Sequence, residues 1–259
     1  MPEALLSCAD VRVRFGGVQA LAEVDFEAFE GKITSIIGPN GAGKTTLLNV
    51  ISGMVPAQTG RILLDGRDLS KAPAHERARA GMVRTFQNLE IFSNMSVLEN
   101  VMTGCHGRLR LGAWQSLLRT PRALALEKKI AEEAMALLEF LGLDGLADSP
   151  ARDLPFGQQR LLELGRALAA GPRLLLLDEP AAGLNIAETR ALGELILRIR
   201  AERGVSVVLV EHDMDLVMGV SDEVTVLCFG QVIRRGVPAE VQRDPEVIAA
   251  YLGEDEEES

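Results

Sequence analysis

Aromatic residues and cysteines are both scarce in this sequence. Phe, Trp and Tyr make up 4% of the 259 residues, so we expect a core built mainly from Leu, Val, Ile and Ala. The three cysteines, Cys8, Cys105 and Cys228, are far apart and form no CxxC pair. This spacing argues against a disulfide framework and against a cysteine zinc site, and it favours reduced thiols.

The sequence also lacks a net positive charge and long hydrophobic runs. The net charge of −10 has the wrong sign for a protein that holds nucleic acid through its phosphates. No apolar run approaches the ~20 residues that a membrane-spanning helix needs. The opening residues, MPEALLSCADVRVRF, have neither the basic start nor the apolar segment of a signal peptide. We therefore expect a protein that does not enter a membrane by itself.

The sequence does contain the alternating strand and helix patterns of an α/β protein. Strands are predicted at 11–15, 32–37, 60–64, 174–178, 205–210 and 224–229. Helices are predicted at 45–51, 123–143, 186–200 and 245–252. Strand patterns vanish between about Asn88 and Ala147. This gap indicates a mostly helical insert in an α/β core.

One glycine-rich segment fits a phosphate-binding loop. Residues 38–45 read GPNGAGKT and match G-x-x-x-x-G-K-[ST]. Glycines let backbone N–H groups turn inward around phosphate oxygens, and the following helix adds the positive end of its dipole. Lys44 would reach the β- and γ-phosphates, and the Thr45 hydroxyl would ligate Mg²⁺. We predict that ATP is bound by Gly38, Pro39, Asn40, Gly41, Ala42, Gly43, Lys44, Thr45 and Thr46.

A second segment, RLLLLDEP at 173–180, supplies acidic groups. Its four leucines predict a buried parallel strand, and Asp178 and Glu179 follow at the carboxyl end, where open α/β sheets place ligands. Asp178 is expected to hold Mg²⁺, and Glu179 to orient and polarise the attacking water. Such a pair alone is more often a helix cap or a solvated loop. Together with the 38–45 loop it favours catalysis.

With LPFGQQR at 154–160 between these two segments, the chain resembles the ATP-binding subunits of ABC transporters over about residues 5–253. The resemblance implies an α/β P-loop NTPase: an ABC-type nucleotide-binding domain with an N-terminal antiparallel β subdomain and a helical subdomain insert. It also implies the division of the chain. The ATP-binding core lobe would be formed by 1–88 and 169–259, and the helical signature subdomain by 89–168.

The resemblance implies further site residues. Gln87 in RTFQN is similar to the Q-loop glutamine, which senses Mg²⁺ and the γ-phosphate. His212 in VEHD is similar to the switch histidine, which contacts the γ-phosphate, and Phe15 fits the aromatic residue that stacks on adenine. The alternatives are an ordinary loop residue for Gln87, a strand-end cap for His212 and a core aromatic for Phe15. The signature would add contacts to ATP across a dimer interface from Phe156, Gly157 and Gln158.

The signature departs from the superfamily pattern at Pro155, where the usual residue is a serine that bonds the γ-phosphate. Proline cannot donate a hydrogen bond from its side chain or its nitrogen. Gly157 and a helix N-terminus expected near Gln158 remain to face the phosphate. One charge-assisted hydrogen bond contributes ~1.5–3 kcal/mol. We therefore predict an active site whose contact across the dimer is somewhat weaker.

Further sequence segments narrow the resemblance to one subfamily. VRFGGVQAL, SVLENVM, DEPAAGLN, VEHDMDLVMGVSD and AYLGE resemble the LivG-type subunit of branched-chain amino acid importers, in which the second signature position is often not serine. This implies ATP hydrolysis that drives amino-acid uptake, with ATP and Mg²⁺ as cofactors. Urea, short amides or another small solute remain alternative substrates. A soluble ABC protein acting on ribosomes or DNA is disfavoured, because the chain has neither tandem cassettes nor coiled-coil arms.

The same resemblance implies partners and location. These are a second ATP-binding subunit, identical or a paralogue, two transmembrane permease subunits and, indirectly, a substrate-binding protein, at the cytoplasmic face of the membrane. One arginine-rich segment, 104–126, contains Arg108, Arg110, Arg119 and Arg122 but no acidic residue. It is interpreted either as a surface near lipid headgroups or the permease, or as an ordinary solvated face.

Overall fold

The computed structural model describes residues 4–105 and 121–257, which form two compact units. The first unit consists of the chain up to Arg84 and from Arg173 onward, and the second of Thr85–Pro172. Most of the arginine-rich segment, including Arg108, Arg110 and Arg119, lies outside the described residues.

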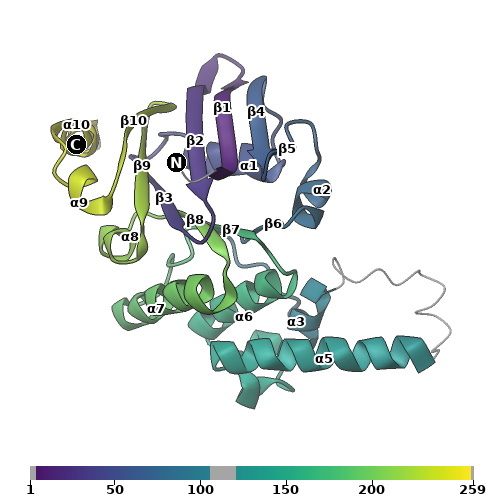
Figure 1. Cartoon of the computed structure of the whole chain (residues 1–259). Coiled ribbons are helices and arrows are strands. Elements are labelled where there is room, and N and C mark those ends of the chain that lie inside the picture. The colour runs from purple at the N-terminus through teal and green to yellow at the C-terminus, as the bar shows by residue number, and fades with distance from the viewer. Residues whose placement is uncertain (1–3, 106–120, 258–259) are drawn as a thin grey trace. The chain divides into compact units, whose positions relative to one another are not determined.

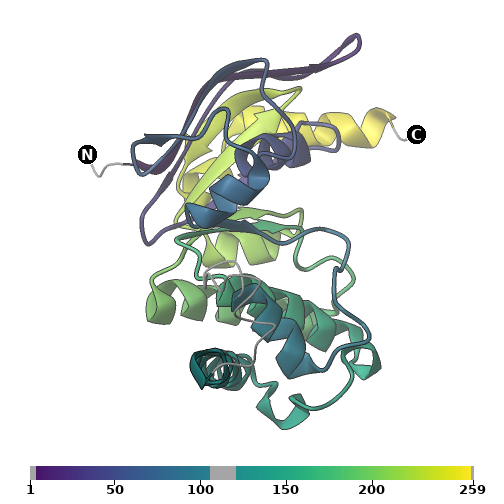
Figure 2. The same ribbon diagram turned by 90° about the vertical axis from the view of Figure 1, so that its right-hand side faces the viewer.

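The first unit begins with a four-stranded antiparallel sheet. β1 (Ala4–Phe15) lies between β2 (Val18–Phe29) and β4 (Thr59–Leu64), and β5 (Arg67–Asp68) completes the order β2-β1-β4-β5. Along β1, buried Val11 and Val13 alternate with more exposed arginines, as a sheet with one buried face requires. Figure 2 shows the turn between β1 and β2 projecting from this sheet. The predicted N-terminal antiparallel subdomain is confirmed.

A second, six-stranded sheet carries the segments with motifs. Its order is β10-β9-β3-β8-β7-β6, with only β10 antiparallel to its neighbour. Three inner strands are buried at every residue, which explains why ITSII, SVVLV and LLLLD show no alternation. The strands are β3 (Ile33–Ile37), β6 (Met82–Arg84), β7 (Leu174–Asp178), β8 (Ser206–Val210), β9 (Glu223–Cys228) and β10 (Gln231–Gly236).

Helices cover both faces of this sheet (Figure 1). α1 (Lys44–Ser52) packs between the two sheets, because its buried leucines share one apolar cluster with residues of both. Ile36 belongs to this cluster and Ile37 to a second one with α8, α9 and α10, as neighbours on a strand point to opposite faces. The other helices of the unit are α2 (Ala74–Arg79), α7 (Ile186–Arg203), α8 (Met214–Val220), α9 (Pro238–Val241) and α10 (Pro245–Glu257).

The second unit is helical, as the loss of strand patterns predicts. It contains α3 (Val97–Cys105), α5 (Pro121–Leu141), α6 (Phe156–Ala169) and the short 3-10 turns Asp144–Leu146 and Ala151–Asp153. α3 and α6 approach closely at Gly104, where an added Cβ would lie 2.1 Å from the carbonyl oxygen of Arg166. α5 ends before Gly142, whose φ of 71° stops the helix. Across the described part of the chain, no helix combines the length and apolarity needed to cross a membrane.

A buried arginine joins α2 to the end of α1. Arg77 is 3% exposed, and its guanidinium donates to the carbonyl oxygens of Val50 at 2.6 Å and Ile51 at 2.7 Å. It also donates to the carbonyl oxygen of Ala72 at 2.8 Å. The last carbonyls of a helix lack an intrahelical partner: Arg77 provides a donor to Ile51 and a second donor to Val50, which also accepts from the Gly53 N–H at 3.2 Å.

We predict that Arg77→Met lowers the free energy of unfolding by about 2–4 kcal/mol, because it removes the guanidinium donor of the Ile51 and Ala72 carbonyl groups. Arg79 lies exposed on the same helix, so Arg79→Met is the matched control and should change stability by less than about 0.5 kcal/mol. Urea unfolding of both variants measures the difference. Equal losses would contradict the role of Arg77.

Candidate functional site

Three neighbouring strands of the six-stranded sheet, β3, β8 and β7, end at one edge (Figure 1). β3 leads into the 38–45 loop, β8 into Glu211 and His212, and β7 into Glu179. The register aligns their ends, because Val210 lies opposite both Ile36 and Asp178. The fold therefore brings the glycine-rich loop, the acidic pair and the histidine to the same edge of the sheet.

The glycine-rich loop requires backbone geometry that other residues rarely adopt. Gly38 has φ 146° and Gly43 has φ 102°. A Cβ on Gly38 would lie 2.0 Å from the carbonyl oxygen of Leu227, and one on Gly43 would lie 2.6 Å from that of Ala20. Gly43 is also the N-cap of α1, and no side chain caps this helix. The positive end of its dipole thus faces the loop, as an anion site requires.

Lys44 is held inside this loop. It is 8% exposed, and its ammonium donates to the carbonyl oxygens of Gly38 at 2.6 Å and Pro39 at 2.9 Å. Thr45 follows in the first turn of α1, and its side chain is exposed. One cation and one hydroxyl therefore lie at the start of the helix, in the arrangement predicted for phosphate and metal binding.

Asp178 lies at the end of β7 and is 2% exposed. Its Oδ2 accepts a hydrogen bond from Arg84 at 2.7 Å, and Arg84 also donates to Asn49 and Ser52 of α1. Its Oδ1 is buried and has no hydrogen-bond partner among the described residues. A buried carboxylate oxygen without a donor is costly, and a cation would compensate it. Asp178 thus fits a metal ligand, and Arg84, which sequence reasoning missed, fixes its orientation.

Glu179 adopts a strained backbone. Its φ is 46°, in the left-handed region, while its N–H donates to the carbonyl oxygen of Val210 at 2.9 Å. A non-glycine residue in this region costs of order 1–3 kcal/mol, and such residues cluster at functional sites. The side chain is half-buried at the edge of the sheet. The strained backbone thus places the Glu179 carboxylate directly after Asp178 at the end of β7.

His212 and its neighbour Glu211 differ sharply in burial. The His212 side chain is 69% exposed, whereas Glu211 is 1% exposed. The Glu211 carboxylate accepts hydrogen bonds from the N–H groups of Ala181, at 2.7 Å, and His212, at 3.0 Å. Burial raises the pKa of Glu211, although these hydrogen bonds oppose the shift. Sequence reasoning missed Glu211, but its signal was the one used for Asp178: an acidic residue at the end of a buried strand.

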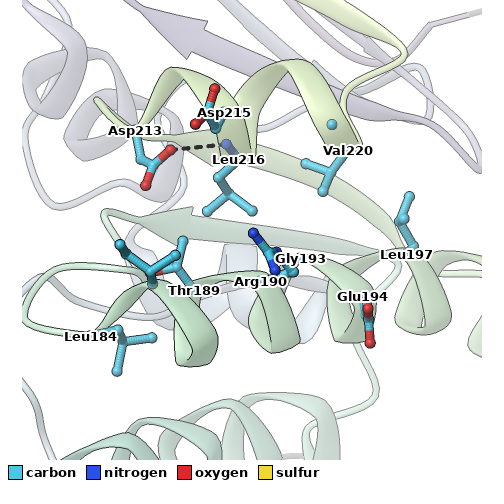
Figure 3. Close-up of a pocket in the computed structure, with 12 residues that line it drawn as sticks. Leu184, Thr189, Arg190, Gly193, Glu194, Leu197, Asp213, Asp215, Leu216 and Val220 are labelled. Carbon is cyan, nitrogen blue, oxygen red and sulfur yellow. Dashed lines mark hydrogen bonds between the residues drawn. The ribbon is translucent and has the colours of Figure 1, made fainter.

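A pocket of about 420 Å³ lies between α7 and α8, beside these loops. Its wall includes Leu184 and Gly193 on one side, and Asp213 and Leu216 on the other. Figure 3 shows Asp213 accepting a hydrogen bond from the Leu216 N–H, 3.0 Å long, which caps α8. The two helices pack closely at Gly193, where an added Cβ would lie 3.0 Å from Leu216 Cδ1, and the pocket opens beside this contact.

Phe15 and Asn185 are two further exposed residues of the first unit. Phe15 is 52% exposed at the end of β1, so the alternative of a core aromatic is wrong. Asn185 is the N-cap of α7, and its side chain accepts from the N–H groups of Ala187 and Glu188. Asn185 thus caps α7 and forms a capping box with Glu188.

The signature segment and Gln87 belong to the second unit. α6 begins at Phe156, two residues before the predicted start near Gln158, and Pro155 is its N-cap with φ −54°. Proline is well suited to a helix start, and this explains the earlier beginning. Arg160, 4% exposed, donates to the carbonyl oxygens of Phe86 at 3.0 Å and Gln87 at 2.9 Å. The signature helix therefore holds the backbone at Gln87, through a residue that sequence reasoning missed.

The exposed groups of this unit are suited to contacts outside it. Phe156 is 44% exposed, Gln87 is exposed, and Gly157 and Gln158 are half-buried. In the part of the chain that the structure describes, no cluster of three or more His, Cys, Asp and Glu side chains could hold a metal ion unaided. A metal at Asp178 would thus need ligands of other kinds, such as a hydroxyl group and phosphate oxygens.

Comparison with known proteins identifies the family. The profile of the family described as ABC transporter matches residues 21–182. A second profile, described as branched-chain amino acid ATP-binding cassette transporter, matches residues 231–257, which include β10, α9 and α10.

Full-length relatives agree with these matches. The chain is 42% identical over 254 residues to the high-affinity branched-chain amino acid transport ATP-binding protein LivG of Escherichia coli K12, covering 98% of this chain and 100% of that protein. The corresponding BraF protein of Pseudomonas aeruginosa gives the same identity and coverage. A probable LivG of Archaeoglobus fulgidus is 38% identical over 94% of this chain and 93% of its own length.

Solved structures share the fold. An ATP-binding cassette of an ABC transporter in its ADP conformation has a TM-score of 0.84 and 34% identity, covering 97% of this chain and 99% of its own. A nucleotide-free cassette has a TM-score of 0.83 and 32% identity, with 96% and 99% covered. The glycine-rich loop, the strand order and these relatives agree, and the chain belongs to the ABC transporter family as one of its ATP-binding, ATP-hydrolysing subunits.

Proposed function

We propose that this chain hydrolyses ATP to drive the import of branched-chain amino acids through a membrane permease. The observation that carries the proposal is the 42% identity to LivG and BraF over nearly the whole of both chains. The match of residues 231–257 to a profile of branched-chain amino acid cassettes supports it independently at the C-terminal end.

In the proposed mechanism, the 38–46 loop wraps the phosphates of ATP and Lys44 neutralises their charge. Phe15, exposed at the β1–β2 turn, stacks on the adenine ring. Mg²⁺ would be held by Thr45, Asp178 and Gln87. The unpartnered Oδ1 of Asp178 supports this assignment. When bound, the metal supplies charge neutralisation on the phosphate oxygens.

Glu179 is the group that we assign to the attacking water. Its carboxylate orients and polarises the water, while His212 contacts the γ-phosphate. The exposure of His212 supports a contact with a group that is not part of this unit. The signature residues Phe156, Gly157 and Gln158 would bind the ATP held by a second ATP-binding subunit, identical or a paralogue.

The proposed roles of these residues also define the proposed lobes and partners of the chain. Residues 1–88 and 169–259 are proposed as the ATP-binding lobe, and 89–168 as the signature lobe that meets two permease subunits. A substrate-binding protein would deliver the amino acid to the permease. We place the chain at the cytoplasmic face of the membrane, attached through the permease.

The first prediction concerns Glu179. Glu179→Gln should lower the rate of ATP hydrolysis by about 10²- to 10⁴-fold, because the amide cannot accept a proton from water. The affinity for ATP should stay unchanged, since the loop and Lys44 are intact. Glu202→Gln, on the exposed part of α7, is the matched control and should leave hydrolysis unaffected. Retained hydrolysis in Glu179→Gln would refute the assignment.

The second prediction concerns Pro155. On the Glu179→Gln background, Pro155→Ser should tighten ATP-dependent dimer closure by about 10-fold or more, since a hydroxyl adds one hydrogen bond to phosphate. Serine is also a good N-cap for α6, so folding should be preserved. Sedimentation with ATP, with the permease partners present, measures closure. If the Pro155 form never closes and the serine form does, the native signature is inactive.

The third prediction concerns the substrate. Cells that carry the Glu179→Gln gene should lose uptake of labelled leucine, isoleucine and valine, while uptake of urea and acetamide stays at the level of native cells. Loss of urea or acetamide uptake with intact amino-acid uptake would replace the substrate and keep the mechanism. No change in any of the five would refute the transport assignment.

A further inference from the structure

Glu211 is the buried carboxylate that joins two loops of the candidate site. It directly follows β8 and directly precedes His212. One oxygen, Oε1, accepts from the Ala181 N–H at 2.7 Å, in the loop that follows Glu179. The other oxygen, Oε2, accepts from the N–H groups of His212 at 3.0 Å and Asp213 at 3.4 Å. Each carboxylate oxygen of Glu211 therefore accepts hydrogen bonds from a different loop.

Strand pairing extends only a short way toward these loops. β7 and β8 pair only as far as Asp178 and Val210, and one backbone hydrogen bond, from Glu179 to Val210, continues the pairing. Beyond that point the pocket between α7 and α8 separates Leu184 from Asp213 (Figure 3). The Glu211 carboxylate thus bonds both loops just beyond the point where strand pairing ends.

A carboxylate is the side chain that suits this position. Its two oxygens accept only, and all the groups that face them in these contacts are backbone N–H donors. A glutamine of the same size would direct an NH₂ group at one set of donors, so one side of the bridge would be lost. Burying a carboxylate is costly, and these hydrogen bonds offset part of that cost.

We propose that Glu211 is a positioning residue that holds the loop of Glu179 and the loop of His212 at a fixed separation. Glu179 can then orient the attacking water while His212 contacts the γ-phosphate. The proposal rests on the roles proposed for Glu179 and His212. It assigns Glu211 no contact with nucleotide. Its effect should therefore fall on the rate of hydrolysis and leave nucleotide binding intact.

The test is steady-state ATP hydrolysis by the purified chain, with and without its membrane partners. Glu211→Gln should lower kcat by about 10- to 100-fold, because small misplacements of catalytic groups have effects of this size, with KM changed by less than about twofold. Glu211→Asp keeps the charge on a shorter stem and should recover part of the loss. Thermal unfolding of each variant reports whether it is folded.

Two further variants separate positioning from a purely structural role. Glu223→Gln removes a carboxylate that pairs with Arg235 on the same sheet, at the start of β9 and opposite Thr34, near the strand ends away from the site, and should leave kcat unchanged even if stability falls. In a His212→Ala background, Glu211→Gln should cost much less than in the native background, because residues acting as a unit are not additive.

Each outcome separates this proposal from the broader function. If Glu179→Gln abolishes hydrolysis but Glu211→Gln keeps native kcat, the positioning role is wrong and the mechanism stands. Fully additive losses from Glu211 and His212 would also overturn it. If Glu179→Gln itself retains hydrolysis, the assignment of the site fails before Glu211 is considered.

Discussion

The pairing of three parallel strands, β3, β8 and β7, is the constraint on which the first unit depends. Their residues are buried at every position, so their register is fixed by packing on both faces. A parallel sheet places the carboxyl ends of its strands along one edge. The loop that follows each strand therefore starts from a fixed point, and the chemistry can be divided among three distant parts of the sequence.

Buried charges then connect these loops to the scaffold. Arg84 holds Asp178 to α1, Glu211 links the segments after β7 and β8, and Arg160 holds the backbone at Gln87 within the helical unit. In each case a charged side chain bonds several groups at once: side chains for Arg84, and mainly backbone groups for Glu211 and Arg160. Burying a charge is costly. Such residues therefore occur where their hydrogen bonds restrain segments that neither strand pairing nor helix packing holds.

The sequence alone predicted the elements with strong patterns. The buried strands, α1, α5 and α7 and the 38–45 loop follow from apolar runs, helical periodicity and glycine spacing. It did not predict α2, α8 or β6, which have seven residues or fewer and owe their stability to tertiary contacts. Arg84 and Arg160 were missed for a related reason, since their partners lie 94 and 73 residues away in the chain. Local patterns carry no information on such contacts.

The left-handed backbone of Glu179 has a consequence for how this position can change. Glycine adopts a φ of 46° without the steric penalty that a glutamate bears. Mutational drift toward glycine at this position would therefore relax the loop while removing the carboxylate. Selection for a more stable fold and selection for ATP hydrolysis act in opposite directions at this residue. Relief of backbone strain at this residue would thus come with the loss of its carboxylate.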